Sequence, residues 1–286
     1  MPEGHTIHAL ARRLERAFVS RPVAASSPQG RFAADAAQID GLVLESAQAR
    51  GKHLVVVIGD RTLHVHLGLI GVFPVLPLSR MPLTTPVPTV RLRLVGEEHV
   101  ADLRGPMICA LIDDERREGI EARLGPDPIE PAADADHAAA RIRRSGKTIA
   151  ELLMDRSVVA GVGNVYRCEV LWRHAVDPFT PGSALGAQAW AEIWADLVHL
   201  LPLGMVFSQI LTMDDQLAEA EHLVSDGRAD EISRQLTGER LGTHFERRFH
   251  VYKRTGEPCH RCANPVQEGQ IAGRTLYWCP ACQVRH

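Results

Sequence analysis

The C-terminal stretch from residue 259 to residue 282 reads CHRCANPVQEGQIAGRTLYWCPAC and contains four of the six cysteines in the chain. The cysteines form two pairs, Cys259-x-x-Cys262 and Cys279-x-x-Cys282, with sixteen residues between the pairs. Two thiolate pairs at this spacing are typical of a structural zinc site, in which four sulfur atoms surround the metal tetrahedrally. Two disulfides are the alternative, which a reducing compartment disfavours. The stretch therefore predicts a small hairpin folded around one zinc ion.

The composition is that of an ordinary globular protein. Of the 286 residues, 45% are hydrophobic and 23% are charged. The first apolar residues alternate with Arg12, Arg13 and Glu15, so no signal peptide is expected. Apolar runs such as 54–58 have the length of strands, so no membrane span is expected either. These features predict a soluble, intracellular protein, in which the remaining cysteines, Cys109 and Cys168, are inert core thiols.

Charge is distributed unevenly along the chain. The formal net charge of −3 and the pI near 6.5 argue mildly against a nucleic-acid-binding protein. Residues 239–286, however, contain eight Arg or Lys against four Glu, whereas residues 214–231 are acidic. The distribution therefore leaves room for a local basic face near the C-terminus.

The first part of the chain predicts one helix followed by strands. Apolar residues at helical spacing predict an amphipathic helix over residues 5–18, which would anchor the N-terminus against a core. Residues 22–31, rich in Pro, Ser, Gly and Gln, predict a loop. Short Val- and Leu-rich runs between turn residues predict strands at 42–44, 54–58, 63–67, 90–95 and 100–103. An antiparallel β-sandwich is the natural packing for such strands.

The second part of the chain is predominantly helical. Apolar residues at helical spacing predict helices at 139–144, 148–154, 165–174 and 187–201. Before the third of these lies Gly161-Val162-Gly163-Asn164, a turn whose backbone amides could approach a phosphate closely. A glycine-rich turn between helices with no ligand is the alternative. Residues 210–245 have weak periodicity and predict variable helix and loop.

The chain begins Met1-Pro2-Glu3-Gly4. Removal of the initiator Met would leave Pro2 as a free secondary amine. A terminal α-amine titrates near ~8, against ~10.4 for lysine, so part of it is unprotonated and nucleophilic at neutral pH. Attack on C1′ of a sugar would give an iminium, and Glu3 could protonate a ring oxygen or a leaving group. The alternative is that Pro2 marks only a processing site before a helix.

Six short motifs together resemble the formamidopyrimidine-DNA glycosylase and endonuclease VIII family of base-excision repair enzymes. They occur in the family's order along the whole chain: Met1-Pro2-Glu3-Gly4, Gly51-Lys52-His53-Leu54, His66-Leu67-Gly68, Leu124-Gly125-Pro126-Asp127-Pro128, Gly161-Val162-Gly163-Asn164-Val165-Tyr166 and Gly273-Arg274-Thr275. Each motif alone is weak. Their common order, together with the cysteine spacing, leaves little room for chance agreement.

The resemblance implies an α+β protein with two domains, an N-terminal antiparallel β-sandwich flanked by helices and a C-terminal helical helix-two-turn-helix domain with a four-cysteine zinc finger. We expect the β-sandwich domain over 1–131, the helix-two-turn-helix domain over 132–249 and the zinc finger over 250–286. The family binds DNA in the cleft between these domains. The implied function is a bifunctional DNA glycosylase and abasic-site lyase. The alternative is a non-catalytic zinc-finger protein that binds DNA or senses damage.

Catalytic roles follow from the resemblance position by position. Pro2 matches the family's nucleophile, which forms a Schiff base at C1′, and Glu3 matches the carboxylate that assists opening of the sugar ring. Lys52 matches a lysine taken as a phosphate contact and proton donor, although on residue type alone a solvated lysine at a strand end is the alternative. Arg274 matches the finger arginine that grips phosphates beside the lesion.

Further residues are expected to contact DNA. Asn164 matches the residue that holds a DNA phosphate. Lys147 is also expected to bind DNA. Such enzymes flip the damaged base out of the duplex and fill the void with an apolar wedge. Leu69 matches the wedge, with Ile70 as its neighbour, and buried packing at a strand end is the competing explanation.

The region around Arg104 departs from the branch of the family that acts on oxidised purines. That branch carries an Arg and a Phe here, but no Phe follows Arg104. The departure favours an endonuclease VIII-like enzyme acting on oxidised pyrimidines, and it weakens a role for Arg104 in reading the opposite base. The expected partner is damaged DNA, double- or single-stranded. We expect a monomer in the cytoplasm, associated with the nucleoid.

Overall fold

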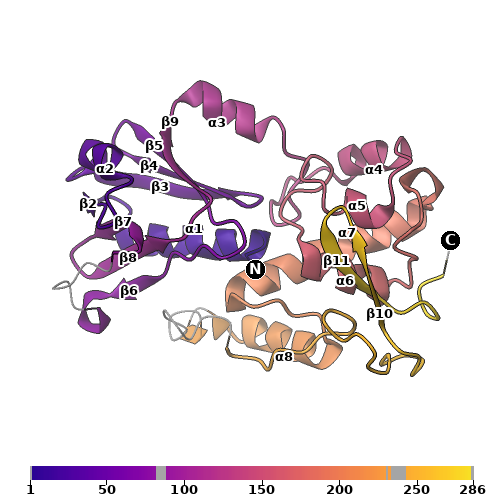
Figure 1. Ribbon diagram of the computed structural model, residues 1–286. Helices are drawn as coiled ribbons and strands as arrows, with labels where there is room; N and C mark the ends of the chain where they lie inside the picture. Colours follow the sequence, from indigo (N-terminus) through magenta and orange to yellow (C-terminus); the bar gives the residue numbers. More distant parts are fainter. Residues whose placement is uncertain (1, 82–87, 230, 233–242, 285–286) are drawn as a thin grey trace. The chain divides into compact units, whose positions relative to one another are not determined.

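The computed structural model describes residues 2–81, 88–229, 231–232 and 243–284 (Figure 1). Its described residues form two compact units, one up to Ala122 and one from Arg123. The predicted boundaries after residues 131 and 249 stay predictions, because the division into units does not separate the finger from the helices.

The first unit contains two antiparallel sheets. The five-stranded sheet has the order β1-β3-β4-β5-β9 and consists of β1 (Arg21–Pro22), β3 (Val43–Arg50), β4 (His53–Ile58), β5 (Arg61–His66) and β9 (Ile108–Ile112). The four-stranded sheet has the order β2-β7-β8-β6 and consists of β2 (Ala24–Ser26), β7 (Val90–Val95), β8 (His99–Arg104) and β6 (Val75–Pro77). The β-sandwich prediction is confirmed.

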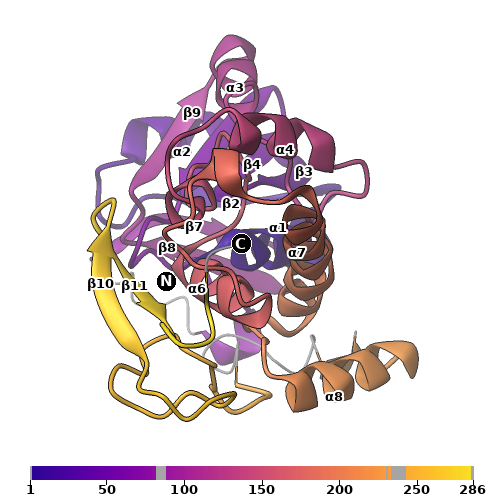
Figure 2. The same ribbon diagram turned by 90° about the vertical axis from the view of Figure 1, so that its right-hand side faces the viewer.

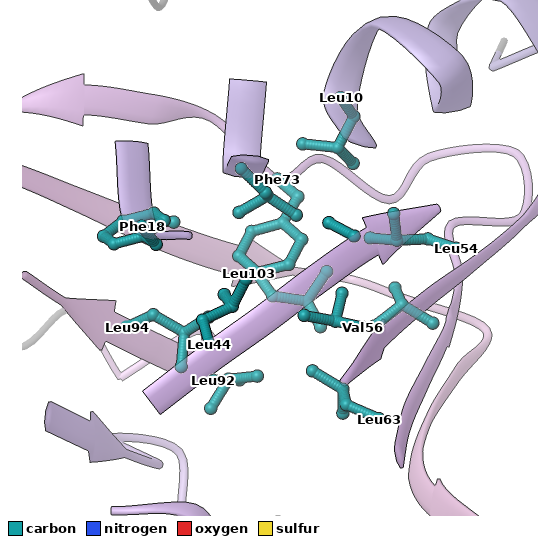
Figure 3. Packing of buried hydrophobic residues seen from close by; sticks show 14 of the residues in the cluster. Leu10, Phe18, Leu44, Leu54, Val56, Leu63, Phe73, Leu92, Leu94 and Leu103 are labelled. Atoms are coloured by element: carbon teal, nitrogen blue, oxygen red, sulfur yellow. The ribbon is translucent and has the colours of Figure 1, made fainter. Parts of the chain in front are cut away.

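The core of the first unit is apolar and continuous. Alternate residues of β4, Leu54, Val56 and Ile58, belong to it and are fully buried, as the pleat of a strand requires. Figure 3 shows Leu54 and Val56 packed among residues from both sheets and from the first helix. Each such side chain contributes about 1.5–3 kcal/mol by leaving water. This core fixes the strand ends from which the functional loops emerge.

Helix α1 (Gly4–Phe18) carries the N-terminus into that core. Its buried residues Ile7, Leu10, Leu14 and Phe18 recur at helical spacing and join the same apolar cluster. Leu10 and Phe18 are labelled among the core side chains in Figure 3. The prediction of a helix over 5–18 is confirmed to within one residue, and the helix anchors Pro2 and Glu3 directly before its first turn.

Several elements of the first unit were not expected. The segment predicted as a loop over 22–31 contains β2 and part of β1, and the strands β6 and β9 were missed. Also missed were α2 (Ala33–Ile39), η1 (Leu78–Arg80) and α3 (Asp114–Glu121). Strands of two or three residues give no measurable alternation, so only their pairing defines them.

The second unit is helical. It contains α4 (Ala135–Arg143), α5 (Ile149–Leu152), α6 (Asn164–Arg173), η2 (Gly182–Ala184), α7 (Ala187–Phe207) and α8 (Asp214–Ser225). Helix α5 begins with a capping box, because Thr148 Oγ1 accepts from the Glu151 amide and the Glu151 carboxylate accepts from the Thr148 amide. These hydrogen bonds also lower the pKa of Glu151. The predicted helices are present, with shifted ends.

Helix α7 is long and apolar enough to cross a membrane by length and composition. The expectation that no segment reaches this length therefore does not hold. One such helix is weak support for a membrane span, because the core helix of a globular domain passes the same test. More than half of its apolar window is buried within the protein, including Ile193 and Leu197, which are fully buried. We interpret α7 as a core helix.

The C-terminal segment forms the expected hairpin. Strand β10 (Gln267–Ile271) pairs antiparallel with β11 (Arg274–Trp278). The turn between them holds Ala272 at a φ of 47° and Gly273 at a φ of 71°, both in the left-handed region. Figure 2 shows this hairpin projecting beside α6. Arg274 is the first residue of β11, directly after the turn.

Candidate active site and nucleic-acid interface

Pro2 and Glu3 differ sharply in their surroundings. Pro2 is half-buried, whereas Glu3, at the N-cap position of α1, has no exposed surface. The Thr6 amide donates to the Glu3 carbonyl at 3.0 Å, which fixes the backbone at the start of the helix. Pro2 therefore keeps part of its surface accessible, while the carboxylate of the next residue is removed from solvent.

Lys52 lies close to the first turn of α1. It occupies the turn between β3 and β4, next to Gly51, whose φ is 58°. Burial first, and then the positive charge of Lys52, lower the pKa of His5 to about 3, so His5 is neutral at pH 7. The structure therefore brings Lys52 to the end of the β-sandwich that carries Pro2.

A cavity of about 710 Å³ opens beside Pro2, within the range of about 300–1,000 Å³ typical of ligand pockets. Its lining includes Pro2 and Leu10 from the N-terminal segment, Leu69 and Phe73 from the loop after β5, and Arg104 from the end of β8. The lining is mainly apolar. Arg13, Arg80 and Arg104 add positive charge to this lining.

Leu69 and Ile70 are exposed at the edge of this cavity. Their exposed fractions are 52% and 82%, values that exclude buried packing at a strand end, the competing explanation for Leu69. Exposed apolar residues side by side mark an interaction surface. The described structure thus leaves Leu69 accessible, as a wedge must be.

Met107 is a third exposed apolar side chain on this surface, and the sequence analysis missed it. Its exposed fraction is 67%, and its amide donates to the His66 carbonyl at 2.8 Å. A Cβ added to Gly68 would lie 3.1 Å from Met107 Cβ, so Met107 lies directly against the Leu69 loop. The sequence shows only an apolar residue at the end of Arg104-Gly105-Pro106-Met107, which does not distinguish an exposed side chain from a buried one.

Arg104 is held by a buried carboxylate. Asp102 accepts two hydrogen bonds from Arg93, at 2.7 and 2.9 Å, and a third from Arg104 at 2.9 Å. Asp102 is fully buried, and its bidentate pairing with the Arg93 guanidinium compensates the cost of burying the charge. The Arg104 side chain is therefore oriented before any ligand arrives.

In the second unit, Asn164 links α6 to the hairpin. Its Nδ2 donates to the Thr275 carbonyl at 2.8 Å, and its Oδ1 accepts from the Arg167 guanidinium. Arg167, fully buried, also donates to the Thr275 carbonyl at 3.2 Å. Because Thr275 follows Arg274, this network fixes the strand that carries Arg274. Asn164 is buried and bonded within the protein.

Buried Glu169 on α6 fastens the segment before the finger. Its Oε2 accepts from Thr212 Oγ1 and the His250 amide, both at 2.8 Å, and its Oε1 accepts from the amides of Val251 and Tyr252, both at 3.0 Å. Four donors satisfy both oxygens of a carboxylate that has no exposed surface. The segment 250–252 is therefore held firmly against α6.

The four C-terminal cysteines converge. Their Sγ atoms all lie within 4.8 Å of one another, with Cys259 3.8 Å from Cys282 and Cys262 3.5 Å from Cys279. A tetrahedron with zinc–sulfur bonds of ~2.3 Å has edges of ~3.8 Å, so the sulfur atoms fit the metal. Trp172 Nε1 donates to Cys259 Sγ at 3.2 Å, and the Arg261 guanidinium lies 4.3 Å from the centre of the Trp172 ring. These contacts fasten the cluster to α6.

The other sequence-predicted residues lie as follows. Lys147, exposed, precedes the N-cap of α5 and has its Nζ 4.0 Å from Asp155. Cys109 and Cys168 lie outside the cluster, and burial raises the pKa of both thiols to about 12, as expected of inert core thiols. Pro2, Glu3, Lys52 and Leu69 belong to the first unit, whereas Lys147, Asn164 and Arg274 belong to the second.

Comparison with known families matches three consecutive parts of the chain. Residues 1–107 match the formamidopyrimidine-DNA glycosylase N-terminal domain, residues 124–214 its H2TH domain, and residues 256–284 a zinc finger found in FPG and IleRS. Endonuclease 8 1 of Mycobacterium tuberculosis is 42% identical over 99% of this chain and 100% of its own length. The chain belongs to the formamidopyrimidine-DNA glycosylase and endonuclease VIII family.

The family assignment makes the protein a DNA glycosylase with abasic-site lyase activity and a zinc-binding finger. Formamidopyrimidine-DNA glycosylase of Desulfitobacterium hafniense is 27% identical, with 99% of each chain covered. The fold also matches Lactococcus lactis Fpg bound to DNA containing an oxidised pyrimidine, at 22% identity, a TM-score of 0.74 and 99% coverage of both chains. At that identity the structural match supports the fold alone.

Proposed function

We propose that this enzyme removes oxidised pyrimidines from DNA through a Schiff base at Pro2 and then cuts the strand by elimination. The observation that carries the proposal is the half-buried Pro2 at the edge of the apolar cavity, followed directly by the fully buried Glu3. The identity to Endonuclease 8 1 and the lack of a Phe after Arg104 favour pyrimidine lesions over purine lesions.

The proposed reaction begins when the Pro2 nitrogen attacks C1′ of the damaged nucleotide. The glycosidic bond breaks, its electron pair leaves with the damaged base, and the proton that the Pro2 nitrogen loses on bonding to C1′ balances the proton that the leaving base takes up. The C1′–O4′ bond then opens, Glu3 supplies the proton to O4′, and C1′ becomes an iminium with Pro2. A proton acceptor then removes a proton from C2′. The electron pair left behind expels the 3′ phosphate, which cuts the strand. Water finally hydrolyses the iminium and regenerates the Pro2 amine.

The cavity beside Pro2 is the proposed place of the extruded base, and Leu69, Ile70 and Met107 form the proposed wedge. Flipping costs a few kcal/mol of lost stacking, which inserted apolar side chains partly replace. Lys52, near the start of α1, is proposed to contact the phosphate beside the lesion and to donate a proton there.

The second unit is proposed to grip the DNA backbone. Arg274 at the start of β11 and Lys147 before α5 supply positive charge, and one zinc ion holds the hairpin that carries Arg274. We infer that Asn164 acts largely by fixing Thr275 and thereby Arg274. The proposed substrate is damaged double- or single-stranded DNA, bound by a monomer in the cytoplasm on the nucleoid.

Reaction with an abasic duplex in the presence of borohydride tests the lyase chemistry. Reduction of the iminium leaves the protein covalently joined to DNA, and we expect one adduct attached at Pro2. A protein with a verified Pro2 terminus that forms no adduct would contradict the proposed mechanism. DNA binding without an adduct would instead support the non-catalytic DNA-binding alternative.

Glu3→Gln should impair base excision more than cleavage of a preformed abasic site. The amide cannot supply the proton to O4′, and we expect excision to fall by about 10²–10⁴-fold, the usual contribution of a general acid. Single-turnover rates on a lesion duplex and on an abasic duplex provide the comparison. Equal losses on both substrates would show that Glu3 also serves the elimination.

Leu69→Ala should slow lesion excision by about 10- to 100-fold, because the wedge loses apolar contact worth about 1.5–3 kcal/mol. The matched control is Val198→Ala, which removes another exposed apolar side chain, on α7. Fluorescence of 2-aminopurine beside the lesion reports the loss of stacking. An unchanged signal and rate in Leu69→Ala would remove Leu69 from the wedge.

A further inference from the structure

Three histidines lie together at one end of the five-stranded sheet, where the proposed site is located. His53 is the first residue of β4 and pairs across the strands with His66, the last residue of β5. His64 lies two residues before His66 and therefore on the same face of the sheet. Leu54 and Val65, which alternate with them, belong to the apolar core, so the histidines occupy the face opposite that core.

His53 and His64 form a buried hydrogen-bonded pair. Their exposed fractions are 6% and 3%, and His53 Nδ1 lies 2.9 Å from His64 Nε2. A single proton lies between these two nitrogen atoms, so one ring donates and the other accepts. Burial is the largest cause that lowers the pKa of His64 to about 4, which keeps its ring neutral at pH 7.

His66 is fixed in one tautomer by the loop that follows it. The Gly68 amide donates to His66 Nδ1 at 3.1 Å, so Nδ1 carries no proton and the neutral ring carries its proton on Nε2. The ring of His53 contacts His66 edge to face, with centroids 4.9 Å apart. His66 thus connects the buried pair to the backbone of the loop that carries Leu69.

The cross-strand pairing of His53 with His66 determines which two loops lie beside the histidines. Because His53 pairs with His66 in antiparallel strands, Lys52 before β4 and the loop after β5 leave the sheet at the same end. Val55, the next residue on this face of β4, is apolar and 7% exposed. His53 and His66 therefore stand at the strand ends from which the Lys52 turn and the Leu69 loop emerge, and His64 lies one pair further in on this face, opposite Val55.

We propose that His53 and His64 are positioning residues that hold His66 as a neutral acceptor for the Gly68 amide and so fix the Leu69 loop beside the Lys52 turn. Neither histidine contacts the reacting atoms in this role, which rests on the proposed base-flipping function. The pair acts through the orientation of His66. Its loss leaves the iminium chemistry intact and impairs insertion of the wedge.

Two substitutions break the pair in different ways. His64→Leu removes the partner of His53 Nδ1, and His53→Phe keeps a ring against His66 but removes the hydrogen bond. In both we expect lesion excision to fall by about tenfold, as when a buried polar group loses its partner. The 2-aminopurine signal should fall in parallel, whereas cleavage of a preformed abasic site should stay within about twofold. His64→Gln, which can restore a hydrogen bond, should recover most of the excision rate.

Two control variants separate positioning from general destabilisation. Val56→Ala lowers stability from the core face of β4, opposite the face that carries the histidines, and His137→Ala removes an exposed histidine on α4. Both should leave the ratio of excision to abasic cleavage unchanged. If His64→Leu changed only the urea midpoint, as Val56→Ala is expected to do, the histidine pair would be structural and the positioning role would be wrong.

Nitrogen-15 NMR of the histidine rings tests the inference without any catalysis. In the wild-type protein at pH 7, we expect His66 to show an unprotonated Nδ1, and in His64→Leu a mixture of tautomers. Wild-type protein that forms no borohydride adduct but shows this tautomer would overturn the proposed function and leave the histidine arrangement standing. A His66 signal unaffected by His64→Leu and His53→Phe would overturn the positioning role itself.

Discussion

Protein that retains one extra residue before Pro2 should give no borohydride-trapped adduct and should cut an abasic duplex at least about a thousandfold more slowly than protein that begins at Pro2. The extra residue converts the Pro2 amine into an amide nitrogen, whose lone pair is delocalised and not nucleophilic. Loss of a covalent nucleophile removes the intermediate itself, and such losses are on the order of 10³-fold or more. Trapping and single-turnover cleavage on the same preparation measure the effect.

The affinity for the abasic duplex should meanwhile stay within about threefold, because no proposed phosphate contact changes. Pro2→Gly with Met1 removed is the matched control, since glycine retains a terminal amine and partial activity. Intact-mass measurement of each terminus is part of the experiment. Full cleavage by the extended protein would contradict the Pro2 mechanism, and a large loss of affinity would mean that the extension blocks DNA sterically.

Cys279→Ser should uncouple the finger from the rest of the second unit. Cys279 is fully buried in the four-sulfur cluster, and metal binding contributes on the order of 10 kcal/mol to folding of small zinc units. Without the metal, the hairpin that carries Arg274 loses the support of the four cysteines, although the hydrogen bonds from Asn164 and Arg167 to the Thr275 carbonyl remain. We expect DNA binding and cleavage to fall about as far as in Arg274→Ala, and the double variant to lose little more.

Salt dependence distinguishes the loss of a phosphate contact from general damage. Arg274→Ala should reduce the slope of log affinity against log salt by roughly one phosphate contact, and Cys279→Ser should reduce it equally. Cys109→Ser, which removes a thiol outside the cluster, should leave both slope and zinc content unchanged. If metal-free protein bound and cut DNA as well as the zinc-loaded form, Arg274 would have no role at the site.

Periodic segments of the fold were predictable from sequence, whereas short elements were not. Helix α1 repeats apolar residues over four turns, so its pattern is unambiguous. Strand β6 has three residues and ends in Pro77, and only its pairing with β8 defines it. Strand β9 follows Gly105-Pro106 and has the continuous apolar sequence ICALI. Such a short apolar run has no periodicity that distinguishes a strand from a buried helix segment. Helix α7 continues through Pro202 because packing outweighs propensity there.

The candidate site, too, has features that the sequence predicts and features that it does not. The cysteine spacing predicted the convergence of the four sulfur atoms, because ligand geometry is encoded locally. The exposure of Leu69 and Met107 could not be read from sequence, since an apolar residue after a strand is as consistent with burial as with a wedge. The hydrogen bond between His53 and His64 depends on strand register, which one sequence does not reveal. Roles for Pro2, Glu3, Lys52 and Arg274 stay predictions.

The four hydrogen bonds that Glu169 accepts bear on how the finger can be exchanged by protein engineering. Glu169 lies on α6, far in sequence from residues 250–252, yet it satisfies three successive backbone amides there. A chimera that received only a foreign segment 256–284 would keep this attachment, but Trp172 and Asn164 would regain their partners, a cysteine sulfur and a backbone carbonyl, only if the foreign finger docked on α6 in the same register. The smallest transplantable cassette is therefore α6 together with the finger, and grafts cut at the cysteines should express as loosely attached tails.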